Sequence, residues 1–105
     1  MKRLLASLLG FGMILSVSAY AEGDVNAGMI KSQTCLGCHG VVNYNNAYPT
    51  YHVPKLGGQH AAYLVAAMKA YKDGLRQHST MHGNVADLSE QDMENLAAYF
   101  EQDGK

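Results

Sequence analysis

The chain is short, nearly neutral and poor in cysteine. Its 105 residues include eight basic and nine acidic side chains, which give a formal net charge of −1, and only two cysteines. This length allows one small domain, and the basic residues are too few and too scattered to indicate a nucleic-acid partner. Two cysteines also exclude a framework of several disulfides.

The N-terminal residues have the order of a secretory signal. Lys2 and Arg3 precede an apolar stretch from Leu4 to Val17, and small residues follow it. The stretch is shorter than the about 20 residues that span a bilayer as a helix. The order therefore favours a cleaved signal peptide over a retained anchor, although the anchor is an alternative.

Two alanines offer cleavage sites. We expect residues 1–21 to be a signal peptide and residues 22–105 to be the mature domain, with cleavage after Ala19 as an alternative to cleavage after Ala21. The sequence thus predicts a periplasmic protein with no stable membrane span after signal cleavage. A mature domain this small builds only a marginal core by itself, so a bound group that staples it is expected.

The first element of the mature chain is a predicted helix over residues 24–34. Asp24 is a favourable N-cap, and the helix leads directly into Cys35. Gly28 in its middle costs about 1 kcal/mol relative to alanine. We expect that cost to be tolerated because another helix crosses closely at Gly28.

A haem-attachment motif follows, Cys35-Leu36-Gly37-Cys38-His39. The two thiols can add to the vinyl groups of a porphyrin, and the histidine after the second thiol can bind the iron as its fifth ligand. The alternative is a thiol–disulfide oxidoreductase that uses the same cysteines. That class needs strands in a βαβ pattern, which this sequence lacks.

Residues 40–54 form a predicted loop, and two further helices are predicted after it. The loop contains Tyr44, Tyr48 and Tyr51, which either cover a prosthetic group or lie on the surface. Apolar residues recur with helical spacing over residues 59–73, and Gly74 is placed to end that helix. Residues 75–88 form a second predicted loop, and Ser89 with Asp92 forms a capping box that begins the last helix. No strand of useful length is predicted.

The sixth iron ligand is predicted from the methionines and histidines after the motif. Met81 lies in the polar segment 79–83, where a bond from its thioether to iron would explain its presence. Met68 and Met93 lie on the apolar faces of predicted helices, where methionine usually fills gaps in a core. His78 and His82 flank Met81 and leave a bis-histidine site open.

Beyond the motif, most of the mature chain resembles class I c-type cytochromes. The segments that carry the resemblance are Gly23-Asp24, Gly28, Cys35 to Gly40, Pro54 to Leu64, Tyr71 to Arg76, Met81, Leu88-Ser89 and Leu96 to Tyr99. They are similar to small bacterial monohaem cytochromes and to the single-haem halves of dihaem periplasmic cytochromes. The resemblance implies an all-α class I cytochrome c fold with three to four helices around one haem. It also implies that the first and last helices cross near Gly28 and Tyr99.

The resemblance also implies roles for individual residues. One covalent haem c would be bound by Cys35, Cys38, Pro54, Leu56 and Leu64, with His39 and Met81 as the iron ligands. The Pro54 carbonyl would accept a hydrogen bond from the His39 ring, and both leucines would contact the porphyrin. The loop over residues 41–53 departs from the family because it has three tyrosines and few glycines.

These observations predict an electron carrier that is not an enzyme. Its redox partners would be a terminal oxidase, a bc-type complex, or a dehydrogenase that uses the chain as its cytochrome subunit. The alternative is a haem-based sensor or enzyme subunit with a labile sixth ligand, which requires that Met81 does not bind the iron.

Overall fold

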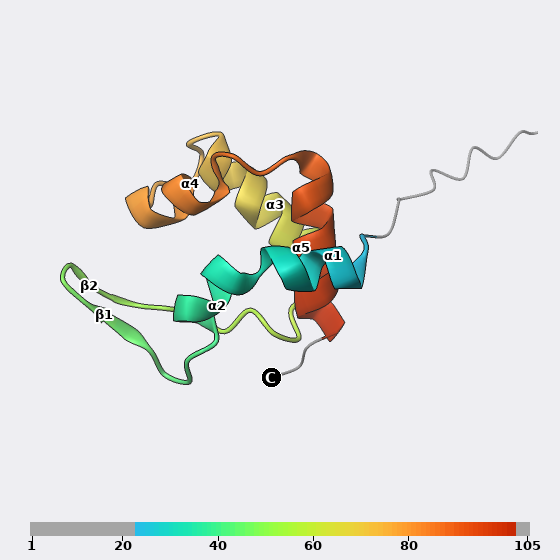
Figure 1. The fold of residues 1–105 in the computed structure, drawn as a ribbon. Coiled ribbons are helices and arrows are strands. Elements are labelled where there is room, and N and C mark those ends of the chain that lie inside the picture. Colours follow the sequence, from blue (N-terminus) through green and yellow to red (C-terminus); the bar gives the residue numbers. More distant parts are fainter. Residues whose placement is uncertain (1–22, 103–105) are drawn as a thin grey trace, which may run out of the picture.

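The computed structural model describes residues 23–102. The expected signal peptide and both cleavage sites lie outside the described residues. Within them the elements are α1 (Val25–Lys31), α2 (Gln33–His39), β1 (Asn45–Ala47), β2 (Thr50–His52), α3 (Ala61–Lys72), α4 (Ser79–Val85) and α5 (Glu90–Gln102) (Figure 1). No helix of this part of the chain has the length and apolar character needed to cross a membrane.

The helical architecture is confirmed, but two predicted loops contain regular structure. The described residues form five helices rather than three to four. The loop predicted over residues 40–54 includes the hairpin of β1 and β2, in which Asn45 pairs with His52 and Ala47 pairs with Thr50. The loop predicted over residues 75–88 includes α4. Sequence periodicity misses α4 because it has seven residues, of which only Val85 is buried.

The first predicted helix is broken once, at Ser32. Helix α1 ends at Lys31 and α2 begins at Gln33, while the buried Ser32 hydroxyl donates to the Met29 carbonyl at 2.7 Å. The Leu36 amide donates to the Ser32 carbonyl at 2.9 Å, so the backbone turns continue across the break. The attachment motif therefore lies within helix α2.

Helix α1 crosses α5 in close backbone contact. A Cβ atom placed on Gly28 would lie 2.0 Å from the Asn95 carbonyl oxygen and 2.9 Å from the Tyr99 Cβ. The Asp24 amide also donates to the Asn95 side-chain oxygen at 2.8 Å. The crossing expected near Gly28 and Tyr99 is therefore confirmed, and glycine is required there because any side chain would overlap the α5 backbone.

Helix α5 provides most of the buried core. The predicted capping box is confirmed, since the Asp92 amide donates to the Ser89 hydroxyl and the Ser89 amide donates to the Asp92 carboxylate, both at 3.0 Å. Its buried apolar residues are Met93, Leu96, Ala97 and Phe100. The last three form one cluster with Leu64 of α3.

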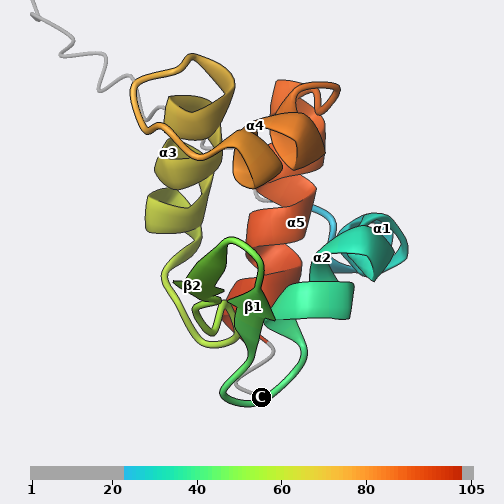
Figure 2. The ribbon, with the colours of Figure 1, turned by 90° about the vertical axis from the view of Figure 1, so that its left-hand side faces the viewer.

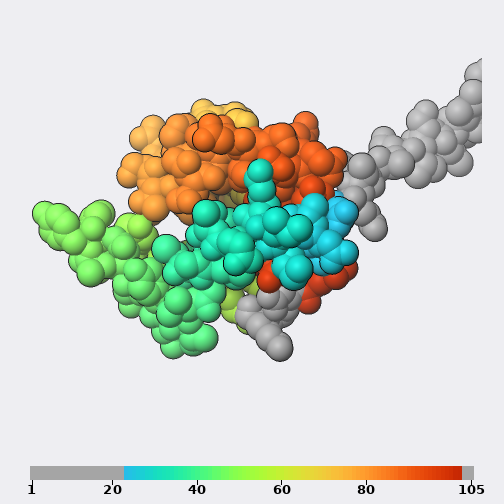
Figure 3. All heavy atoms as spheres, in the orientation of Figure 1, coloured from blue at the N-terminus to red at the C-terminus, as the bar shows by residue number. Residues whose placement is uncertain are grey.

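Helices α2, α3 and α4 and the hairpin lie on one side of α5 (Figure 2). Viewed with the hairpin toward the reader, α4 lies above, α3 and α2 lie on either side, and α5 lies behind (Figure 2). The hairpin extends beyond the rest of the described chain (Figure 3). Tyr48 in its turn is 96% exposed, so this tyrosine covers no apolar group within the chain.

Candidate functional site

An apolar cavity of about 420 Å³ lies between α2, α3, α4 and α5. This volume is in the range of small-molecule and cofactor sites, roughly 300–1,000 Å³. All seven residues predicted to contact or bind the cofactor line it: Cys35, Cys38, His39, Pro54, Leu56, Leu64 and Met81. The fold thus brings together four stretches that are distant in sequence.

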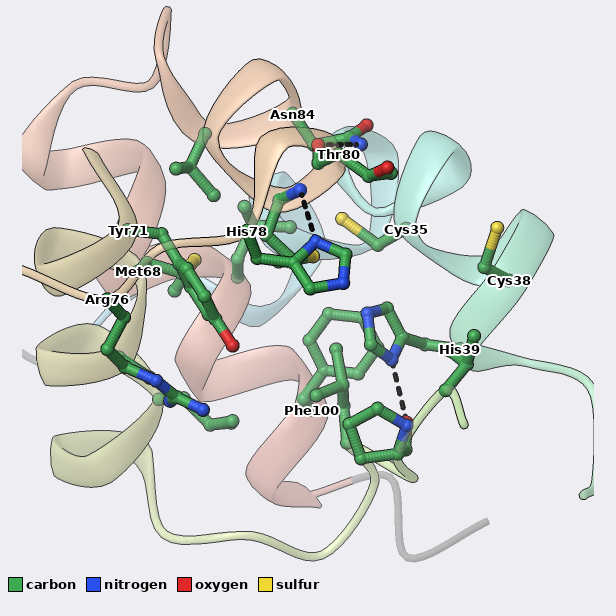
Figure 4. A pocket seen from close by; sticks show the side chains of 18 of the residues that line it. Cys35, Cys38, His39, Met68, Tyr71, Arg76, His78, Thr80, Asn84 and Phe100 are labelled. Atoms are coloured by element: carbon green, nitrogen blue, oxygen red, sulfur yellow. Dashed lines mark hydrogen bonds between the residues drawn. The ribbon is translucent and has the colours of Figure 1, made fainter. Parts of the chain in front are cut away.

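Helix α2 places both thiols and the imidazole of the motif on the same side of the cavity (Figure 4). Residues three and four apart share one face of a helix, and Cys38 and His39 are three and four residues after Cys35. Neither cysteine forms a disulfide, and Cys35 is partly buried while Cys38 is exposed. Burial raises the pKa of the Cys35 thiol.

His39 is held by a backbone carbonyl. Its Nδ1 lies 2.7 Å from the Pro54 oxygen (Figure 4). A carbonyl oxygen only accepts, so Nδ1 carries the proton and donates it to this bond. The lone pair of the neutral ring is therefore on Nε2. The contact that the resemblance implies is present, and it is the arrangement that orients metal-binding histidines.

Met81 lies on the α4 side of the cavity. The loop predicted around Met81 is wrong, because residues 79–85 form helix α4. Met81 is half-buried and lines the cavity. Its amide donates to Nδ1 of His78 at 3.3 Å. The His78 side chain thereby caps the helix that bears Met81.

The two histidines left open as ligands occupy different environments. His82 does not line the cavity, and its Nδ1–H donates to the Tyr71 carbonyl at 2.9 Å. His78 does line the cavity, and its ring meets the Tyr51 ring edge-on, with centroids 4.7 Å apart. Only His78 of this pair therefore reaches the cavity.

Sequence reasoning missed a polar end of the cavity. Arg76 lies 4.4 Å from the centroid of the Tyr71 ring, and both line the cavity with Tyr51 and His78. Figure 4 shows Tyr71 and Arg76 across the cavity from Cys38 and His39. The family resemblance included the segment from Tyr71 to Arg76, and this was the one sequence signal that pointed to these residues. It suggested no role for either side chain.

The lining fits a haem better than a bare metal ion. Within residues 23–102 no group of three or more His, Cys, Asp or Glu side chains could hold a metal ion by itself. The cavity instead combines an apolar lining with two thiols, an imidazole whose Nε2 is unprotonated, and a thioether. Such a donor set suits iron that arrives within an apolar macrocycle attached through the cysteines.

Comparisons with known proteins agree with this chemistry. The family model described as Cytochrome c matches residues 27–102. Cytochrome c4 of Pseudomonas aeruginosa is 42% identical over 100 residues, which are 95% of this chain and 48% of that protein. Cytochrome c-554(548) of Halomonas halodenitrificans is 41% identical over 81 residues, 74% of this chain and 94% of that protein.

A solved structure extends the comparison to the fold. The crystal structure of reduced recombinant cytochrome c4 from Pseudomonas stutzeri aligns with a TM-score of 0.57 and 26% identity, over 78% of this chain and 50% of that one. The chain thus spans about half the length of the cytochrome c4 proteins that it matches. It belongs to the cytochrome c family, as a small class I c-type cytochrome with one covalently attached haem.

Proposed function

We propose that the chain is an electron-transfer protein in which Cys35 and Cys38 hold the haem while His39 and Met81 bind its iron. The observation that carries this proposal is the meeting of all four side chains at one apolar cavity. When bound, the haem supplies reversible one-electron exchange between ferric and ferrous iron. Two protein ligands leave no open position for a substrate, which favours electron transfer over catalysis.

The residues around the ligands have supporting roles. The Pro54 carbonyl fixes the orientation of the His39 ring and its tautomer, so that Nε2 remains available to iron. Leu64 is buried in the cluster on α5, and Leu56 packs against the same cluster. Both side chains line the cavity, where they exclude water. A dry surrounding and a thioether ligand both favour ferrous iron and raise the reduction potential.

We infer a periplasmic location from the order of residues 1–21, in which a basic start, an apolar stretch and small residues precede the domain. The redox partner would be a terminal oxidase, a bc-type complex or a dehydrogenase. Family membership supports an electron-transfer partner of some kind, and no motif of the chain selects among these three.

Replacement of Met81 tests the ligand set. Ferric haem with a thioether ligand has a weak near-infrared absorption band. We expect Met81→Ala to lose this band and to bind carbon monoxide in the ferrous state, because the sixth position is then vacant. Met68→Leu is the matched control, since Met68 also lines the cavity but packs against the core from α3.

The control variant should keep the band and exclude carbon monoxide. A band that persists in Met81→Ala would remove Met81 from the ligand set and point to Met68, the other methionine that lines the cavity. A wild-type ferric protein that lacks the band, with Met81→Ala still closed to carbon monoxide, would instead transfer the role to His78, which lines the cavity and caps α4. If the wild-type ferrous protein itself binds carbon monoxide readily, a sensor with a labile sixth ligand replaces the electron carrier.

A further inference from the structure

We propose that His78 is the positioning residue for Met81 and is not an iron ligand. The inference rests on the proposed function, in which Met81 binds the iron. It concerns the helix that carries the ligand, since α4 has only seven residues and one buried side chain, Val85. A helix this short has little stability of its own, so the side chain at its start decides whether Met81 is held in place.

The His78 ring acts as the N-cap of α4. The backbone of His78 is extended, with φ −158° and ψ 108°, and its Nδ1 accepts a hydrogen bond from the Met81 amide. Met81 is the third helical residue, which is the position whose free amide an N-cap side chain usually satisfies. The cap therefore contacts the backbone of the ligand residue itself.

The same bond fixes the tautomer of His78. Because Nδ1 accepts the Met81 amide, it carries no proton, and a neutral ring must carry its proton on Nε2. An Nε2 that carries a proton cannot also coordinate iron. His39 has the opposite arrangement, with its proton on Nδ1 and its lone pair on Nε2. Both imidazoles line the cavity, but the tautomer of His39 suits iron binding and the tautomer of His78 suits helix capping.

The ring of His78 also connects α4 to the hairpin. Tyr51 of β2 meets it edge-on, at a centroid distance of 4.7 Å and an interplanar angle of 84°. The Tyr51 hydroxyl donates to the Thr80 hydroxyl at 3.3 Å. Tyr51 therefore contacts the cap and the first turn of α4 together, which limits the rotation of the His78 ring about its side-chain bonds.

Two substitutions separate capping from space filling. Asparagine is a favourable N-cap but is smaller than histidine, whereas leucine has comparable bulk and cannot accept a hydrogen bond. If His78 positions Met81, His78→Asn should keep the near-infrared band and the wild-type cyanide affinity. His78→Leu should bind cyanide roughly fivefold more tightly, since loss of an N-cap typically lowers the equilibrium constant for forming the helix by about that factor.

Amide hydrogen exchange gives a second readout that does not depend on iron ligation. In the reduced protein, the Met81 amide should exchange roughly fivefold faster in His78→Leu than in wild type. The His78→Asn variant should protect it as wild type does. Rescue by asparagine, measured on the Met81 amide, distinguishes a cap from a general loss of packing.

Three results would overturn the inference, and they separate it from the proposed function. If leucine preserves the Met81 site and asparagine does not, His78 only fills space. If both variants lose the sixth ligand while Met81→Ala keeps it, His78 is the ligand, and the proposed ligand set fails as well. If Met81→Ala loses the band but neither His78 variant changes the Met81 amide, the ligand set stands and only the positioning role is wrong.

Discussion

Two seven-residue helices, α2 and α4, bear the residues proposed to bind the iron, and they are anchored by different contacts. Helix α2 continues from α1, whose Gly28 lies against the α5 backbone. Its last residue, His39, donates to the Pro54 carbonyl at 2.7 Å. Helix α4 is anchored by one buried side chain, Val85, by the hydrogen bond that His78 accepts from the Met81 amide, and by the one that His82 donates to the Tyr71 carbonyl.

The difference indicates where the site should be weaker. Close backbone contact cannot relax without moving a whole helix, whereas exposed side-chain bonds open with little cost. Besides Val85, the α4 side depends on the partly buried His78 and Tyr51 and on the exposed Thr80. We therefore expect the Met81 bond to break before the His39 bond when the protein is heated or exposed to a competing ligand.

The largest effect should follow from replacing the two cysteines of α2. We expect Cys35→Ser with Cys38→Ser to abolish covalent attachment, so that acid–acetone extraction carries the pigment into the organic layer. Gly37→Ala is the control between them, because a Cβ at Gly37 would have nothing within 4 Å. Pigment that stays on the protein of the double variant would show attachment elsewhere.

The second largest effect should follow from a change at the crossing of α1 and α5, which supports α2. Gly28→Ala places a Cβ 2.0 Å from the Asn95 carbonyl oxygen, so α1 must move away from α5. Overpacking of this kind typically lowers the free energy of unfolding by about 1–3 kcal/mol. For a domain of this size the melting temperature should fall by roughly 4–8 °C per kcal/mol. A neutral result in thermal unfolding followed by circular dichroism would contradict the close crossing.

On the α4 side, the matching glycine-to-alanine substitution should raise the free energy of unfolding instead of lowering it. Gly83 lies inside α4, and a Cβ there would have nothing within 4 Å. Gly83→Ala should therefore raise stability by about 0.5–1 kcal/mol, because alanine loses less backbone entropy in a helix. Urea unfolding would detect this gain. A loss of stability instead would mean that residues 79–85 are not helical in solution.

The α2 side was predictable because its information is local in sequence. The five residues of the motif are enough to indicate haem attachment. The neighbouring helices are indicated by signals that each depend on one type of contact, namely Asp24, Gly28 and the Ser89–Asp92 box. All three signals predicted the right contacts. The break at Ser32 was not predictable, since Ser32 keeps a helical backbone conformation. Its buried hydroxyl is satisfied by a hydrogen bond to the Met29 carbonyl in the same turn.

The α4 side was less predictable because its cap is an unusual residue and its contacts with the hairpin join residues far apart in the chain. The cap at His78 uses a residue type outside the usual N-cap set, so no start signal was visible. The hairpin contact between Tyr51 and His78 spans two elements that lack apolar alternation. Met81 nevertheless lines the cavity, as the family resemblance led us to expect, although the loop predicted around it is helix α4.

The central claim is that Met81 binds the iron at the cavity that His39 lines. The most direct test is carbon-13 labelling of the methionine methyl groups, with the spectrum of the reduced protein recorded by NMR. A methyl group held over a porphyrin experiences its ring current, so we expect one methionine methyl to be shifted far upfield and to be absent from Met81→Ala. Met93 serves as an internal reference, since it is buried in α5 and does not line the cavity. A spectrum in which no methionine methyl is shifted upfield would contradict the claim.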